Sequence, residues 1–100
     1  MESTVKVGTF SKQPGERLSN SILYTDALDV GDYIETVDSC VATPSGGLTV
    51  TAGLSSNDRV RIWYEGGADK TAYVVTVTVT THGGERFEDE VVCKVSEVAR

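Results

Sequence analysis

The residues in this chain best suited to chemistry are one histidine, two cysteines and a group of aspartates. His82 is the only histidine, and histidine is the side chain that most readily exchanges a proton near neutral pH. A general base acts on a group within hydrogen-bond reach, and the glycine turn that follows His82 supplies no activated nucleophile. We therefore expect an exposed loop histidine, no catalytic residue and no enzymatic activity.

The two cysteines allow either a disulfide or part of a zinc site. Cys40 and Cys93 each stand among apolar residues, in "DSCVA" and "VVCKV". A structural zinc ion takes about four ligands, and two distant cysteines with one histidine do not supply them. Because the opening residues "MESTVKVGTFSKQPGE" have no signal-peptide pattern, we expect a cytoplasmic chain with reduced, buried thiols.

Three aspartates, Asp26, Asp29 and Asp32, offer the carboxylate oxygens that calcium prefers. They lie three positions apart with Gly31 directly before the last, whereas an EF-hand loop places its first ligands at every second position. The segment "GGADKT" likewise lacks the glycine spacing of a phosphate-binding loop. These patterns predict solvated loop carboxylates, no metal site and no cofactor.

The overall charge limits the classes of partner. The chain has nine Lys and Arg against fifteen Asp and Glu, a net charge of −6. Nucleic acids and anionic membrane surfaces attract clusters of Lys and Arg, so we expect neither as a partner. No apolar run approaches the roughly 20 residues that a membrane-spanning helix needs.

Alternation of apolar and polar residues dominates the chain, which is typical of β-strands with one solvated face. The clearest strand covers 73–81, and Gly83-Gly84 suits a tight hairpin turn into a return strand at 87–95. Asp89 interrupts the apolar series of the return strand, which predicts a bulge or a departure from the core there. The residues expected to face the core are Tyr73, Val75, Val77, Val79, Phe87, Val91, Cys93 and Val95.

Four further strands are indicated at 16–24, 34–42, 47–54 and 57–67, and a possible seventh in "STVKVGTF". Six or seven short strands in about 100 residues predict an all-β domain, either a two-sheet antiparallel sandwich or a small barrel. We expect residues 1–12 to form an N-terminal arm or edge strand, and residues 13–98 to form a single domain.

One strand face carries residues suited to protein docking. Arg59, Arg61 and Trp63 alternate with the apolar Val60 and Ile62, so they share the opposite face. Arg and Trp are enriched at the energetic centres of interfaces. In the alternative interpretation, Trp63 covers the outside of its own sheet and the arginine stems pack over it. The sequence leaves both interpretations open.

The residues resemble those of the small fiber-tail adaptor proteins of tailed bacteriophages. The similarity rests on "RIWYEGGADKTAYVVTVTVTTHGGERFEDEVVCKV", on "KQPGERLSNSILYTDAL" and on "TPSGGLTVT", in that order, from about Lys12 to Val95. The resemblance implies an Ig-like β-sandwich in a virion structural protein of the tail or portal region, present in several copies and assembled in the host cytoplasm. Its implied partners are other virion proteins, such as the tail tube, the portal ring or a fiber.

Three segments are the expected contacts of such an adaptor, which works by docking. Two alternatives remain: a capsid decoration protein, and a β-sandwich module that recognises a receptor or carbohydrate. The second needs an aromatic platform, and Trp63 and Tyr64 lie on opposite faces of their strand. The predicted contact residues are Arg59, Arg61 and Trp63, then His82, Glu85 and Arg86 at the hairpin tip, and Val5, Val7 and Phe10 in the N-terminal arm.

Overall fold

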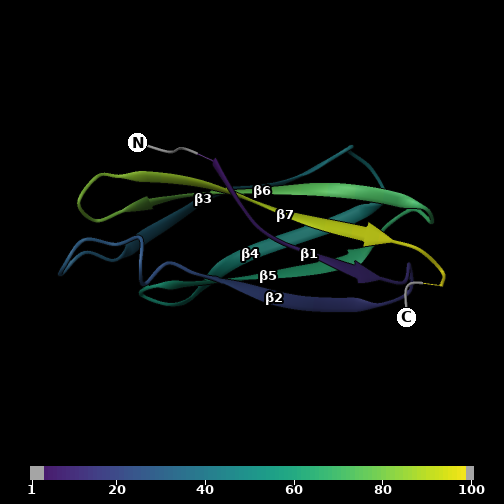
Figure 1. The fold of residues 1–100 in the computed structure, drawn as a ribbon, viewed down its shortest axis with the longest axis horizontal. Helices are drawn as coiled ribbons and strands as arrows, with labels where there is room; N and C mark the ends of the chain where they lie inside the picture. The colour runs from purple at the N-terminus through teal and green to yellow at the C-terminus, as the bar shows by residue number, and fades with distance from the viewer. Residues whose placement is uncertain (1–3, 99–100) are drawn as a thin grey trace.

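A computed structural model describes residues 4–98, and within them the chain folds into seven β-strands in two layers (Figure 1). Residues 4–98 include no helix that is long and apolar enough to cross a membrane. The strands are β1 (Thr4–Lys12), β2 (Arg17–Leu23), β3 (Ile34–Thr43), β4 (Leu48–Ser56), β5 (Arg59–Gly66), β6 (Thr71–Thr81) and β7 (Arg86–Val95).

The seven strands form two sheets that pack face to face. Sheet A has the strand order β1-β7-β6-β3, and sheet B has the order β2-β5-β4. Neighbouring strands run antiparallel, with one exception: β1 pairs with β7 in parallel. β6 and β7 form the predicted hairpin. The chain passes from sheet A to sheet B through the turn between β3 and β4.

The predicted all-β sandwich is confirmed, and the parallel β1–β7 pair is its one departure from antiparallel pairing. Lettered A to G in chain order, the sheets read A-G-F-C and B-E-D. An immunoglobulin domain places C, F and G in one sheet and A, B, E and D in the other. The present order differs in the first strand, which joins the sheet of the last one. The Ig-like assignment stays a prediction.

Alternation along the strands builds the core between the sheets. Every residue predicted to face inward on β6 and β7 is buried, and Val60, Ile62 and Tyr64 of β5 face them with no exposed surface. Phe10 of β1 packs edge-to-face on Tyr64, with 4.6 Å between the ring centres. Both cysteines are free. Cys93 is buried, as the apolar sequence around it predicted, whereas Cys40 is only half-buried.

The prediction that β7 bulges or leaves the core near Asp89 is wrong. Asp89 pairs in regular register with Val77, and only 6% of its surface is exposed. β7 has a bonded neighbour on each side, β1 and β6, so its backbone stays in place and carries the carboxylate inward. The residue lies near Tyr24, whose ring stacks on Phe87 at 5.9 Å.

Buried polar contacts tie together the loops at one end of the sandwich. Lys12 has no exposed surface, and its Nζ donates hydrogen bonds to the carbonyl oxygens of Gly66 at 2.5 Å and Gln13 at 2.7 Å. The hydroxyl of Tyr73 accepts a hydrogen bond from the Ala68 amide at 2.9 Å and donates to the Gly46 carbonyl at 3.3 Å. These contacts join the end of β1 to the end of β5, and join β6 to the β3–β4 and β5–β6 loops.

The two long sides of the sandwich differ. β3 and β4 pack against each other and close one side. On the other side lie the outer edges of β1 and β2, which belong to different sheets and are not paired with each other. The open strip between them is called the seam below.

Candidate docking surfaces

The outward face of sheet B carries the predicted arginine and tryptophan residues. β5 is the central strand of this sheet, so Arg61 and Trp63 stand in the middle of the face. Their cross-strand neighbours are small: Ser21 and Gly53 flank Arg61, while Ser19 and Thr51 flank Trp63. The large side chains therefore rise above a surface of small ones, as anchors of a docking surface do.

Two cations lie over the Trp63 ring. The Arg17 guanidinium carbon is 4.1 Å from the ring centre, and that of Arg61 is 5.3 Å away. Arg17 also pairs with Glu65, with 3.7 Å between Nε and Oε1, and both side chains are more than half exposed. We call Arg17, Arg61 and Trp63 the Trp63 cluster. A hollow beside it is lined by Thr51, Gly53 and Leu54 of β4, among others.

The sequence pattern missed Arg17 and gave more weight to Arg59. Arg17 lies on another strand, and its approach to Trp63 depends on the register in which β2 pairs with β5. Arg59 is exposed on the same face, across from Leu23 at one end of the sheet. The guanidinium groups of Arg17 and Arg61 lie over Trp63, and the side chains of both arginines are exposed to solvent. The docking interpretation stays a prediction.

The hairpin tip between β6 and β7 is a second exposed surface, and contacts with the loop before β3 hold it. Asp32 Oδ1 accepts hydrogen bonds from the backbone amides of Tyr33 and Gly83, both at 2.9 Å. These bonds lower the pKa of the Asp32 carboxyl, although slight burial acts in the opposite direction. Glu85 accepts a backbone hydrogen bond from Thr81 through its carbonyl, which closes the turn.

His82 is exposed, as predicted, and contacts with neighbouring side chains hold its ring in place. Its ring stacks on Tyr33 at 4.8 Å, and its Nδ1 lies 3.1 Å from Glu35 Oε1. Arg86 lies 4.0 Å from Asp38 through Nε and Oδ2, with 73% of its side chain exposed. Thr36 and Thr80 donate hydrogen bonds to Asp38, and these bonds lower the pKa of its carboxyl. The tip therefore presents its side chains on a fixed turn.

The N-terminal contacts predicted at Val5, Val7 and Phe10 lie on β1. The backbone of Val5 pairs with Asp89, and Val7 falls at a register shift between Lys6 and Gly8. The side chains of Val5 and Val7 lie outside the described part of the structure. Phe10 is half-buried and points toward the core, so it offers little of its ring to a partner.

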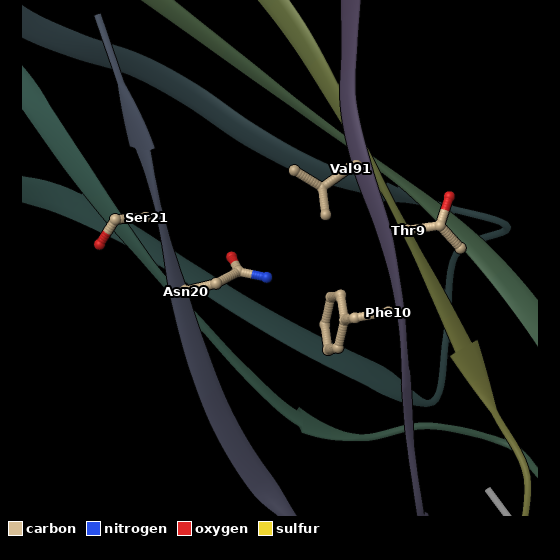
Figure 2. Close-up of a pocket in the computed structure, with 6 residues that line it drawn as sticks. Thr9, Phe10, Asn20, Ser21 and Val91 are labelled. Atoms are coloured by element: carbon tan, nitrogen blue, oxygen red, sulfur yellow. The ribbon is translucent and has the colours of Figure 1, made fainter.

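The seam between β1 and β2 forms a groove (Figure 2). Phe10 and Asn20 point into it from the two edges, and Val91 of β7 points into it from behind β1. Ser21 and Thr9 point away from it. Asn20 Oδ1 accepts a hydrogen bond from the Tyr64 hydroxyl at 2.7 Å. This bond fixes the orientation of the Asn20 amide group at the edge of the core.

The two thiols and the acidic side chains are the remaining groups that could do chemistry, and among the described residues they are not gathered into a metal site. Burial raises the pKa of both cysteine thiols, Cys40 and Cys93, to about 11, so they are protonated and weakly nucleophilic at neutral pH. Among the described residues, no three His, Cys, Asp or Glu side chains are grouped as a metal ion would require.

A known protein family matches most of the chain. The family model of the podophage GP4 fiber-tail adaptor protein gp77 matches residues 12–94. The chain belongs to this fiber-tail adaptor family. No curated protein matches the chain. The matched range runs from the last residue of β1 to the penultimate residue of β7, so it includes the whole of sheet B.

The fiber-tail adaptor family confirms the resemblance seen in the sequence. The chain is a bacteriophage structural protein of the tail and a component of the virion, whose partners are other tail components and fibers. The Trp63 cluster falls inside the matched range, whereas β1 lies outside it except for Lys12. The half-buried Trp63 and its two arginines therefore lie within the part of the chain that the family model matches.

Proposed function

We propose that this chain is a non-enzymatic adaptor that joins a tail component to a tail fiber through the outward face of sheet B. The observation that carries the proposal is the Trp63 cluster, a half-buried tryptophan with two arginine guanidinium groups over its ring, among small residues on the neighbouring strands. A partner that covers the ring desolvates a large apolar area and meets two guanidinium groups, which bind carboxylates and carbonyl oxygens well.

An adaptor needs a second contact region, and the hairpin tip is the best candidate. Asp32, Tyr33 and Glu35 hold His82 and Gly83 in place, so the tip loses little conformational freedom when a partner binds. Several copies on one particle would add the strength of individually weak contacts. The protonated thiols suit assembly in the reducing host cytoplasm.

The other two candidate functions have less support. A carbohydrate platform needs neighbouring exposed aromatic rings, and Tyr64 has no exposed surface, so Trp63 lacks an aromatic partner from its own strand. A capsid decoration protein would have similar surfaces, and the family description is the reason to prefer the tail.

The proposal is tested by Trp63→Ala in the phage genome that encodes the chain. We expect particles with tails but with few or no attached fibers in electron micrographs, because the side chain that anchors the contact is gone. The purified variant should keep the circular dichroism spectrum and cooperative melting of the wild type, since Trp63 lies outside the core.

Lys94→Ala is the matched control, because Lys94 is exposed on the outward face of the opposite sheet. It should leave fiber attachment unchanged. Normal fiber counts on Trp63→Ala particles would refute a docking role for the sheet B face.

A further inference from the structure

The four edge strands of the sandwich differ in how well they could pair with another strand. β1 has a register shift between Lys6 and Gly8, and β3 has two register shifts. β4 has a shift near its end and packs against β3. Such irregularities and covered edges discourage pairing between molecules. β2 pairs with β5 in unbroken register from Arg17 to Leu23 and leaves its other edge without a paired strand.

The sequence of β2 lacks the usual devices that protect an edge. It reads "RLSNSIL", with no proline, no lysine and a single charge at its first residue. The segment is also nearly symmetric about Asn20, with Ser19 and Ser21 next to it and Leu18 and Ile22 beyond them. A strand with this symmetry presents the same residue types when it is read in either direction.

We propose that β2 pairs antiparallel with β2 of a second copy of this chain, about a two-fold axis at Asn20. In this register Ser19 lies opposite the second copy's Ser21, and Leu18 lies opposite its Ile22. Opposed hydroxyl and apolar pairs stabilise antiparallel sheets. Arg17 lies opposite Leu23, so no like charges face each other across the new ladder. The contact is isologous, with one patch used by both copies, as in most two-fold dimers.

Asn20 stands at the centre of this arrangement. Its Oδ1 accepts the Tyr64 hydroxyl, and its amide lies in the seam with Phe10 and Val91 (Figure 2). An amide oxygen has two lone pairs, and the NH2 group has two donors. Two Asn20 side chains that meet at the axis can therefore each donate to the other and keep the Tyr64 hydrogen bond. A polar pair of this kind specifies one register over its alternatives.

The pairing gives one continuous six-stranded sheet, in the order β4-β5-β2 and then β2-β5-β4 of the second copy. One row of neighbours across the joined sheet then reads Trp63 and Ser19 of one copy, followed by Ser21 and Arg61 of the other copy. Both Trp63 clusters then lie on the same face. The strand pairing itself does not depend on the proposed function. The idea that a partner binds both Trp63 clusters at once rests on the proposed function.

The test is the mass of the purified chain in solution, measured by light scattering after size exclusion across a wide concentration range. Two double variants at outward positions 19 and 21 separate this interface from any other. In S19K/S21K, each lysine faces a lysine of the second copy; in S19K/S21E, each lysine faces a glutamate. We expect a dimer for the wild type and for S19K/S21E. The dissociation constant of S19K/S21K should be at least about tenfold weaker than that of S19K/S21E.

Each other outcome overturns the pairing. A wild-type chain that is monomeric at every concentration overturns it, and leaves this edge free for a strand of another tail protein. Equal dissociation constants for the two variants would show that positions 19 and 21 do not face each other. Circular dichroism melts of both variants verify that they fold. Fiber counts on Trp63→Ala particles report the proposed function separately from this result.

Discussion

The guanidinium of Arg17 lies 4.1 Å from the centre of the Trp63 ring, although the two residues stand on different strands and far apart in the sequence. The contact joins the edge strand of sheet B to its central strand on the outward face. It covers part of the ring with a cation and leaves the rest for solvent or for a partner. The half-buried tryptophan of this adaptor is therefore held in a defined orientation before any partner binds.

Arg17→Gln should make Trp63 more accessible without a large loss of stability. Because Trp63 is the only tryptophan, quenching of its fluorescence by acrylamide reports on this ring alone. We expect a larger quenching constant and a change in unfolding free energy below about 1 kcal/mol, because Arg17 is more than half exposed. Arg59→Gln is the control, because Arg59 lies on the same face of the sheet. Among the described residues, the cations over the ring are Arg17 and Arg61. Equal effects of the two variants would argue against the Arg17 contact.

Lys12→Ala should destabilise the fold by about 2–4 kcal/mol, because it removes a fully buried stem and two hydrogen bonds to carbonyl oxygens. Lys12→Met should recover part of this loss, since methionine restores the apolar stem and not the ammonium group. Urea unfolding at neutral pH measures both changes. Lys94→Ala, at an exposed position on the neighbouring strand, should change stability by less than about 0.5 kcal/mol. A wild-type value for Lys12→Ala would contradict the role of Lys12 as a link between loops.

Asp89 should make the fold less stable as the pH rises from acidic to neutral. Burial raises its pKa above the ordinary value of 3.8, and contact with the Tyr24 hydroxyl offsets part of this rise. Neither Asp89 Oδ2 nor the Tyr24 hydroxyl has a hydrogen bond of regular geometry among the described residues, so the contact is loose. Between 3.8 and the raised pKa, the folded state binds more protons than the unfolded state, and stability therefore falls as pH increases through this window.

Asp89→Asn removes this titration while keeping the size of the side chain. At pH 7 the variant should exceed the wild type in unfolding free energy by about 1–3 kcal/mol, because no buried charge remains. The difference should shrink as the pH is lowered through this window and level off well below 3.8, where the wild-type carboxyl is protonated in both states. Urea unfolding in steps of pH measures the gap. Glu90→Gln, on the outward face of β7, is the matched control, and a gap for Asp89→Asn that is the same at every pH would contradict the prediction.

Gly67→Ala should destabilise the fold by about 1–3 kcal/mol. Gly67 has a φ of +106°, and an added Cβ would lie 2.7 Å from Val95 Cγ2 in the core. Gly15→Ala is the control, because nothing lies within 4 Å of a Cβ there and the backbone is not in the left-handed region. Thermal melts of the two variants compare them directly. Similar melting temperatures would mean that the loop before β6 can shift to accommodate a side chain.

Much of the fold could be predicted from local alternation. Side chains on a strand point to alternate faces, so the order of residues already places Tyr64 inward and Trp63 outward, and both positions are as the pattern predicts. The hairpin of β6 and β7 follows from Gly83-Gly84 and two alternating runs. The likeness to fiber-tail adaptors could also be predicted from the sequence, and the family match over residues 12–94 confirms it.

The tertiary structure decided what alternation along one strand does not contain, namely which strands pair and in which register. Arg17 reaches Trp63 because β2 pairs with β5, and Lys12 is buried because β1 joins β7 in parallel and ends against the loop at Gly66. Asp89 broke the local pattern and still lies in the core, because the ladders on both sides of β7 hold its backbone in place. These relationships depend on contacts between distant segments, whose free energy is shared among many residues, and no single stretch of sequence specifies them.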